Sequence, residues 1–419
     1  MRKNSPLLLV LPLIVLLSAG SAKKPDTGKF ETFIVRQDSL MVAAYKNRDV
    51  AGYERLMQEA DARYAALKPK QQKAFSGNMA DAYYNFACLY SLEKQTDNAL
   101  HYLEKSIKHG FTDYSHIKSD TDLDNIRNTE RYKTLTEPLR SVSDYLWILQ
   151  HAAAFNNSEA QQLPVFTYQP PADPNLTALR ITYKLDSVAG NGTEVSRIIN
   201  LMHWIHDRIK HNGNRGNPDE KNAMSLLRVC SAENRTLNCR GLATVLNEMY
   251  LSMGFASRLV TCLPKDSLGT DMDCHVINAV YSHALGKWLW MDPTNDAYVM
   301  DENNNLLSIQ EVRFRLVYGK PLKINETANW NHQQQTKIED YLYTYMAKNL
   351  YMLQCATESR YDYETAQQGK TTTYIQLIPL DYRKNKPGLH VRKLKSKRTH
   401  QLWYTNNENA FWAAPTFSK

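Results

Sequence analysis

Residues 234–296 read NRTLNCRGLATVLNEMYLSMGFASRLVTCLPKDSLGTDMDCHVINAVYSHALGKWLWMDPTND, and this stretch decides the fold that we predict. Apolar side chains recur there every three or four residues, at Leu242, Leu246, Met249 and Met253. That spacing predicts a helix, and Gly254 suits the left-handed position after a helix end. Cys239 stands where the preceding loop turns into this helix. A thiol in the first helical turn lies near unpaired backbone N–H groups and the positive end of the helix dipole, which favour the thiolate.

Two predicted strands follow the helix, and each carries a polar residue near one end. His275 lies in DCHVINAVYS, an alternating run that places His275, Ile277, Ala279 and Tyr281 on one face. Asp292 ends WLWMDP just before Pro293, where a strand cannot easily continue. Cys239, His275 and Asp292 thus supply a nucleophile, a base and a group that orients the base. The alternative is structural, because buried cysteines mostly behave as small hydrophobic side chains.

The order of these elements resembles a known family. A helix that begins with Cys and ends in Gly-Phe-Ala-Ser-Arg is followed by a strand, the His275 strand and a Trp-rich strand ending in Asp-Pro-Thr. In this combination residues 190–320 resemble the transglutaminase-like cysteine-enzyme superfamily, which has a papain-like scaffold. The resemblance implies that Cys239, His275 and Asp292 are a catalytic triad that needs no cofactor. It also implies a second oxyanion donor beside the Cys239 N–H, which the sequence does not place.

The sequence departs from the family pattern at two places near the predicted triad. Leu237 stands two residues before Cys239, where Gly is common, and Val276 and Ile277 follow His275 in place of a small residue and Trp. All three triad positions are nevertheless filled, so we expect an intact site.

The first 22 residues have the features of a secretory signal peptide. Arg2 and Lys3 supply the charged start, residues 7–17 form an apolar run, and residues 18–22 offer small side chains for cleavage. An anchor helix is the alternative, but the run is short for a membrane span. No later stretch approaches that length, and no Cys directly follows the run as in lipoproteins. We therefore expect an exported protein, periplasmic or secreted, with no membrane span.

Composition narrows the remaining functional classes. The chain has 419 residues, enough for two or three domains, and a formal net charge of +8. Much of the positive charge lies between Arg383 and Arg398. Such a run either attracts anionic polymers or lipid head groups or is a solvated surface. Nothing else indicates nucleic acid, so we expect no nucleic-acid partner.

The six cysteines give no metal-site pattern. There is no CxxC and no pair of histidines four residues apart, so we expect no zinc site. An oxidising compartment would permit disulfides, and if Cys239 stays reduced at least one of the other five is unpaired.

Residues 23–154 have a helical pattern. Within them, residues 83–107 resemble one tetratricopeptide repeat, whose packing positions are filled by Tyr83, Phe86, Ala87, Tyr90, Ala99, Leu103 and Ser106. One repeat cannot bury its faces alone, so helices at about 30–75 and 120–150 must complete the layer. The module either binds a peptide or protein partner or serves as a spacer or lid for the catalytic domain.

The segments around the predicted site give further local signals. Residues 155–178 are rich in proline and predict a linker, and residues 179–185 alternate like a strand. Thr193 and Ser308 are expected to cap helices that end near Ile209 and Tyr318. We expect the nearby histidines to be surface or packed side chains rather than ligands: His203, His206 and His211. Residues 336–354 predict a helix, and the strand-like residues 370–419 either pack on the core or present an aromatic surface to a ligand.

We therefore predict an α+β fold in three parts. These are a helical tetratricopeptide-like region at 23–154, a transglutaminase-like catalytic domain at 179–335, and a C-terminal helix with a basic, strand-like extension at 336–419. His275 would deprotonate Cys239, whose thiolate attacks an amide carbonyl of a peptide or protein, while Asp292 orients the imidazole.

The fate of the acyl-enzyme separates the functional alternatives. If water attacks the acyl-enzyme, the protein is a protease or amidase. If a lysine-like amine attacks it, the protein is a crosslinking acyl transferase. Transfer needs a site that keeps water out. The walls that we expect, the strand Trp288–Trp290 and the polar loop Pro264–Asp271, show no apolar tunnel. We therefore predict hydrolysis, and a non-catalytic binding protein that uses the helical module remains a further alternative.

Overall fold

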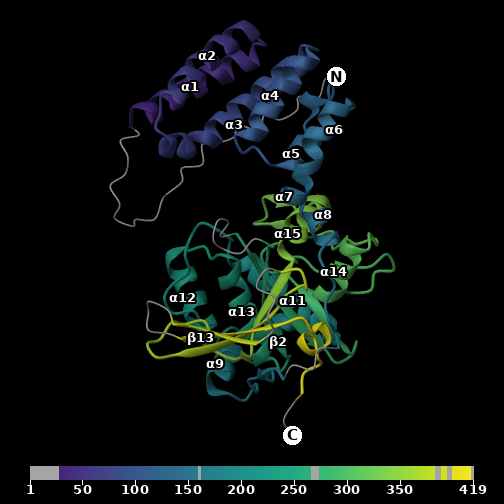
Figure 1. The fold of residues 1–419 in the computed structure, drawn as a ribbon. Helices are drawn as coiled ribbons and strands as arrows, with labels where there is room; N and C mark the ends of the chain where they lie inside the picture. Colours follow the sequence, from purple (N-terminus) through teal and green to yellow (C-terminus); the bar gives the residue numbers. More distant parts are fainter. Residues whose placement is uncertain (1–27, 159–161, 266–272, 383–387, 394–398, 417–419) are drawn as a thin grey trace. The chain divides into compact units, whose positions relative to one another are not determined.

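The computed structural model describes residues 28–158, 162–265, 273–382, 388–393 and 399–416 (Figure 1). The predicted signal peptide at residues 1–22 lies outside these ranges. The chain divides into two units, Met1–Leu139 and Arg140–Lys419. Within the described ranges, no helix combines the length and the apolar character that a membrane crossing requires.

The first unit is built only of helices in its described part. They are α1 (Gly28–Lys46), α2 (Val50–Ala65), α3 (Pro69–Leu92), α4 (Thr96–Lys108), α5 (Tyr114–Ser119), α6 (Glu130–Thr136) and two short 3₁₀ turns, Thr121–Leu123 and Glu137–Leu139. Turns of three residues separate α1 from α2, α2 from α3, and α3 from α4, so these helices pack as neighbours (Figure 1). Asp49 caps α2 by accepting a hydrogen bond from Gly52 N at 2.8 Å.

Aromatic side chains form the core of this unit. The rings of Tyr53 and Phe86 stack with centroids 4.9 Å apart, and both side chains are buried. All the packing positions named for residues 83–107 are buried, on the helix pair α3–α4. Side chains from α1, α2 and α6 join the same cluster. The expected completion of the layer by flanking helices is therefore observed up to Leu139, whereas residues 140–150 belong to the second unit.

The second unit combines helices with a mixed sheet. Its helices are α7 (Arg140–Ser143), α8 (Tyr145–Gln150), α9 (Pro174–Thr182), α10 (Leu185–Ala189), α11 (Glu194–Arg208), α12 (Ala223–Glu233), α13 (Cys239–Ser252), α14 (Ile309–Val317), a π-helix (Glu339–Met346), α15 (Ala347–Asn349) and α16 (Glu408–Phe411). Its main strands are β2 (Ser257–Leu263), β3 (His275–Ser282), β4 (Lys287–Met291), β9 (Met352–Ala356), β11 (Thr371–Leu377), β12 (Gly388–Lys393) and β13 (Thr399–Thr405). Short pairs are formed by β1 (Thr167–Tyr168) with β10 (Glu358–Ser359), β5 (Val299–Met300) with β6 (Lys323–Ile324), and β7 (Asn329–Trp330) with β8 (Gln334–Gln335).

The seven main strands form one sheet in the order β12-β13-β11-β9-β2-β3-β4. Among the described pairings of this sheet, β11 with β13 is parallel and the others are antiparallel. One face of the sheet packs on α9–α13 and the other on α14, the π-helix, α15 and α16. Figure 1 shows α11, α12 and α13 gathered in this unit with β2 and β13. The mixed helix-and-sheet architecture is the one predicted.

Three helices, α11, α13 and α14, begin where the sequence predicts. Thr193 accepts from Ser196 N at 3.2 Å at the start of α11, and Ser308 forms a capping box at the start of α14. Helix α13 begins at Cys239 and is followed by Gly254 with φ of +85°. In the predicted His275 strand, Ile277, Ala279 and Tyr281 do share one face, because all three pack in the same cluster.

The prediction of a strand at residues 179–185 was wrong, because this stretch is helical. Asp173 caps α9 by accepting from Asn175 N at 2.9 Å, and Pro174 occupies the first helical turn. Leu176 and Leu179, three residues apart, are fully buried on the inner side of this helix. The proline-rich stretch before it also contains β1, which pairs with β10.

The C-terminal residues belong to the same sheet as the predicted site. The helix expected at 336–354 ends at Asn349, and strand β9 then pairs with β2. Strands β11, β12 and β13 extend the sheet, so the predicted boundary at residue 335 runs through this unit. Arg258 holds the end of the chain by donating to Phe411 O at 2.6 Å and Ala413 O at 3.2 Å. Of the two alternatives for residues 370–419, packing on the core is observed for the described elements β11 and α16, whereas most of β12 is exposed.

Candidate active site

Cys239 occupies the first position of α13, so its backbone N–H has no carbonyl partner within the helix. Asn238 caps the helix by accepting from Gly241 N at 3.1 Å. The amide of Asn217 holds Asn238 from outside, donating to Asn238 Oδ1 at 2.7 Å and accepting from Asn238 N at 3.1 Å. A Cβ atom at Gly241 would lie 2.7 Å from Asn217 Oδ1 and would push this amide away from Asn238. The turn that presents the thiol is therefore fixed from both sides.

The structure brings His275 against both other predicted site residues. His275 Nε2 lies 2.7 Å from Asp292 Oδ2, and both side chains are buried. Since Nε2 is used by the carboxylate, Nδ1 is left for the side-chain contact that His275 makes with Cys239. The sulfur also lies 3.9 Å from Cys274 O, at the start of strand β3. Strands β3 and β4 are antiparallel neighbours, and this pairing brings His275 and Asp292 together.

Asp292 is held by four hydrogen bonds in a fully buried position. Its Oδ2 accepts from Tyr341 OH at 2.6 Å and Asn295 Nδ2 at 3.0 Å in addition to His275, and its Oδ1 accepts from Thr294 N at 2.8 Å. The indole of Trp290 donates to Tyr341 OH at 3.2 Å. A carboxylate with this many donors stays ionised in a buried site.

A second histidine contacts the thiol. His211 makes a side-chain hydrogen bond with Cys239. It reaches this place because residues 211 and 237 form a parallel bridge, with Asn212 N donating to Leu237 O at 2.7 Å. His211 is half-buried, which agrees with the expectation of a surface or packed side chain, and the contact with Cys239 adds a neighbour that the sequence does not indicate. His203 and His206 instead contact the loop after Asp292, through Asp296 Oδ1 at 2.6 Å and Pro293 O at 3.0 Å.

The electrostatics favour an ion pair between Cys239 and His275. Burial raises the pKa of the Cys239 thiol, but hydrogen bonds from His211 and His275 and the charge of His275 outweigh it and lower the pKa to about 6. Burial lowers the pKa of His275, but the charge of Asp292 and the hydrogen bond to it raise the pKa to about 10. Burial raises the pKa of Asp292, and the charge of His275 with three side-chain hydrogen bonds lowers it to about 2. Near neutral pH the set is therefore thiolate, imidazolium and carboxylate.

The structure does not place the expected aromatic strand as a wall of the site. Trp288 and Trp290 are 4% and 0% exposed and lie in the hydrophobic core, so the prediction that they line the site was wrong. Strand β4 alternates with Leu289 and Met291 facing the helical layer of α11–α13, which turns both indoles to the opposite face. Most of the loop Pro264–Asp271 lies outside the described residues.

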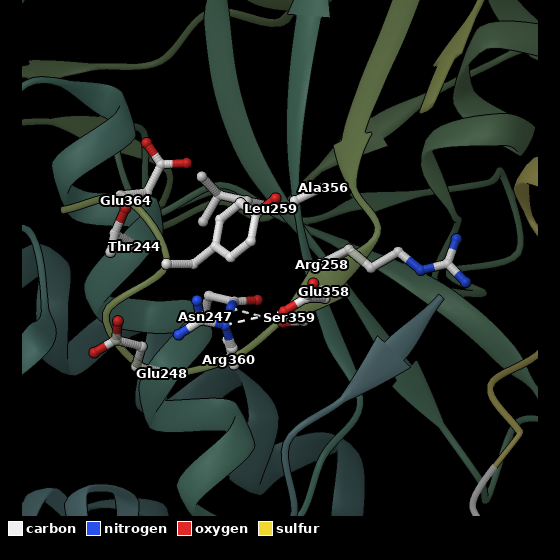
Figure 2. Close-up of a pocket in the computed structure, with 11 residues that line it drawn as sticks. Thr244, Asn247, Glu248, Arg258, Leu259, Ala356, Glu358, Ser359, Arg360 and Glu364 are labelled. Carbon is white, nitrogen blue, oxygen red and sulfur yellow. Dashed lines mark hydrogen bonds and ion pairs between the residues drawn. The ribbon is translucent and has the colours of Figure 1, made fainter. Parts of the chain in front are cut away.

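A polar cavity of about 20 Å³ lies farther along α13, between this helix, β2 and residues 356–364 (Figure 2). A cavity of this size admits water but no peptide side chain. Glu248 lines it and accepts from Ala223 N at 2.6 Å and Asp362 N at 2.9 Å. Burial raises the pKa of Glu248 to about 8, although the two backbone N–H groups act in the opposite direction. Cys239 does not line this cavity, so we assign it a structural role.

Sequence reasoning missed Tyr341 and the role of His211. Tyr341 lies on the π-helix, 49 residues after Asp292, and nothing in its local pattern distinguishes it from a core tyrosine. His211 lies three residues after the end of α11, in the segment that leads to α12 and the Cys239 helix. No described group of three or more His, Cys, Asp and Glu residues is arranged to hold a metal ion.

Comparison with known proteins shows that one stretch of the chain matches a family model. Residues 181–293 match the model described as the transglutaminase-like superfamily, which confirms the resemblance inferred from the sequence. The matched residues include Cys239, His275 and Asp292, and they cover well under half of the chain. A comparison with curated proteins found no match. This region is thus a transglutaminase-like domain, which supports a cysteine-enzyme or acyltransferase class.

Proposed function

From this transglutaminase-like domain we propose that the protein is a cysteine hydrolase that cleaves amide bonds of peptides or proteins. The observation that carries the proposal is the buried chain of contacts from Cys239 through His275 to Asp292, with 2.7 Å between His275 Nε2 and Asp292 Oδ2. The pKa of the thiol near 6 and that of His275 near 10 favour a reactive thiolate at neutral pH. Cys239 is partly exposed, so a substrate can reach it.

In the proposed reaction the Cys239 thiolate attacks the amide carbonyl and forms a C–S bond. The carbonyl oxygen becomes an oxyanion, which accepts from the Cys239 backbone N–H. His275 then gives its Nδ1 proton to the leaving amine as the C–N bond breaks, which leaves a thioester and neutral His275. Asp292 remains ionised and keeps the ring in place through Nε2.

The second half of the reaction restores the resting site. Neutral His275 takes a proton from water, whose oxygen attacks the thioester carbonyl. The tetrahedral intermediate collapses with cleavage of the C–S bond, releasing a carboxylic acid and the Cys239 thiolate. We favour water over an amine as acceptor because the indoles of Trp288 and Trp290 are in the core and therefore do not form an apolar tunnel over the thioester.

Two wider parts of the proposal rest on sequence. Export is proposed from the charged start, apolar run and small residues of positions 1–22. A tetratricopeptide-like role for α3 and α4, as a surface for a protein partner, is proposed from the buried positions of residues 83–107.

Mass spectrometry of a casein digest incubated with the protein and a labelled primary amine tests the reaction. Hydrolysis predicts cleaved peptides, or a mass gain of about one unit at glutamine from deamidation, in wild type and not in Cys239→Ala. Amine incorporation as the main Cys239-dependent product would make the protein an acyl transferase. A wild type that yields no Cys239-dependent product, and whose Cys239 is not labelled by a carbonyl-directed thiol probe, would favour the non-catalytic binding protein.

A further inference from the structure

His211 is held in place from two sides beside the thiol. Its backbone pairs with the segment that leads to Cys239 through the bridge to Leu237. On the other side Asn331 clamps the same residue, with its Oδ1 accepting from His211 N at 2.7 Å and its Nδ2 donating to His211 O at 3.0 Å. Asn331 is buried, with 7% exposed. The backbone of His211 is therefore fixed on both sides, by Asn331 and by the segment that leads to Cys239.

The hydrogen bond from Trp330 determines which ring nitrogen of His211 carries the proton. Trp330 Nε1 lies 3.2 Å from His211 Nδ1. An indole N–H can only donate, so Nδ1 must accept, and a ring that accepts at Nδ1 is the neutral imidazole with its proton on Nε2. With Nδ1 taken by the indole, the contact that His211 makes with the sulfur uses the Nε2–H group. His211 is therefore a neutral donor aimed at the thiol.

This role differs from that of the other histidine at the sulfur. The partner of His275 is the carboxylate of Asp292, which stabilises a positive charge on the ring and makes it a proton carrier. The partner of His211 is an indole donor, which offers no stabilisation to a positive charge and leaves a fixed N–H. One thiol thus faces a charged histidine and a neutral one.

We propose that His211 is the second oxyanion donor of the site, acting with the backbone N–H of Cys239, and that Trp330 sets its tautomer. The proposal rests on the proposed acyl-transfer chemistry at Cys239. When the thiolate bonds to a carbonyl carbon, the carbonyl oxygen develops charge beside the sulfur. A donor that meets the sulfur in the resting state is then within reach of that oxygen, and a pre-placed neutral donor is what stabilises such charge.

The contacts of the other candidate donors differ from those of His211. Asn238 Oδ1 caps α13 and accepts from Asn217 Nδ2. The ring of Trp204 lies against Tyr183, with ring centroids 6.0 Å apart, and under Arg208, 4.9 Å from its ring. Of these three residues, His211 is the one whose hydrogen bond lowers the pKa of the Cys239 thiol.

Four variants of the full chain test the proposal. His211→Ala removes the donor, and we expect kcat to fall by about 10²–10³-fold with little change in KM. His211→Gln keeps an N–H donor near the position of Nε2 but cannot act as a base, so it should recover most of kcat. Trp330→Phe removes the bond that fixes the tautomer, and a loss of about fivefold is expected. His101→Gln, a matched change on the exposed side of α4, should have wild-type kcat.

A second measurement does not depend on any substrate. The pH midpoint of Cys239 alkylation by iodoacetamide should rise in His211→Ala and stay near the wild-type value in His211→Gln, because only the first loses the donor to the thiolate. Wild-type kcat in a folded His211→Ala protein, or an unchanged alkylation midpoint, would overturn the proposal. If wild type has no turnover, the proposed function fails and the alkylation midpoint still decides whether His211 donates to the sulfur. If His211→Ala does not fold, Trp330→Phe decides the matter. Wild-type kcat together with a wild-type alkylation midpoint in Trp330→Phe would overturn the proposal.

Discussion

The thiolate of Cys239 gives the sharpest prediction, because its pKa changes how alkylation depends on pH. In wild type the pKa of the thiol is lowered to about 6, mainly by hydrogen bonds from two histidines against the opposing effect of burial. At about pH 6 roughly half of Cys239 is then thiolate, whereas an ordinary thiol with a pKa of about 8.5 is only about 0.3% ionised. The thiolate populations differ by about 160-fold.

The expected rate difference is smaller than the population difference. A thiolate of lower pKa is a weaker nucleophile, and with a Brønsted slope of about 0.45 a difference of 2.5 pKa units costs about 13-fold. Cys239 should therefore react about tenfold faster than an ordinary thiol at about pH 6. By about pH 8.5 it should react several-fold more slowly, and the two rate curves should cross at about pH 7.4. The crossing is the signature, because greater exposure alone would speed alkylation at every pH.

The assay is iodoacetamide alkylation followed by peptide mass spectrometry between about pH 5 and pH 10. His275→Gln is the comparison, since it removes the cation and should move the Cys239 midpoint above about 8. Cys239→Ala identifies any signal from Cys274, the other partly exposed cysteine. A wild-type midpoint above pH 8, or one that His275→Gln leaves in place, would refute the ion pair.

Three further predictions follow from the same contacts. His275→Ala and Asp292→Ala should each lower turnover, with a loss of about 10²–10⁴-fold for His275 and a smaller loss for Asp292; near wild-type turnover in His275→Ala on any substrate would contradict the assignment. Tyr341→Phe removes one hydrogen bond to a buried carboxylate, so the free energy of unfolding should fall by about 1.5–3 kcal/mol in urea titrations, and an unchanged value would show that the bond to Asp292 adds nothing. Between about pH 6.5 and 8.5 the folded ion pair and the neutral unfolded side chains bind equal numbers of protons, so their contribution to stability should be level. It should then fall by about 1.3 kcal/mol from pH 8.5 to 10, because the unfolded thiol ionises while folded His275, with its pKa raised to about 10, keeps its proton. In Cys239→Ser the fall should begin earlier, at about pH 6.5, because Asp292 still raises the pKa of His275 and no unfolded thiol balances its proton.

Local signals made the predicted site accessible from sequence. Helix capping and strand ends depend on a side chain and the backbone within a few residues of it. The side chains of Thr193, Ser308 and Asp292 each accept a hydrogen bond from a backbone N–H two or three residues later. The pairing of β3 with β4 was also within reach, since only residues 283–286 separate them. Cys239 and His275 are placed by the helix start and the strand start, which are both local features.

The contacts that tune the site were not accessible in this way. Tyr341 meets Asp292 and Trp330 meets His211 only because the chain returns from residues 329–346 to the sheet. Such contacts depend on tertiary packing, and a tyrosine or tryptophan in a helix or hairpin is more often plain core. The strand prediction for residues 179–185 was wrong for another reason. The apolar residues alternate there as in a strand, but Asp173 caps a helix that runs through residues 174–182.

These returning segments lead to a last prediction, that residues 179–335 cannot fold as an independent domain. In that fragment β2 loses its neighbour β9, which pairs with it from Val260↔Cys355 to Leu263↔Met352, and becomes an unprotected edge. Asp292 loses Tyr341, and one face of the sheet loses the cover of the π-helix. Differential scanning calorimetry should show a cooperative transition for a fragment of residues 140–419 and none for residues 179–335. A cooperative transition in the shorter fragment, with Cys239 still titrating near pH 6, would mean that the C-terminal strands and Tyr341 are dispensable.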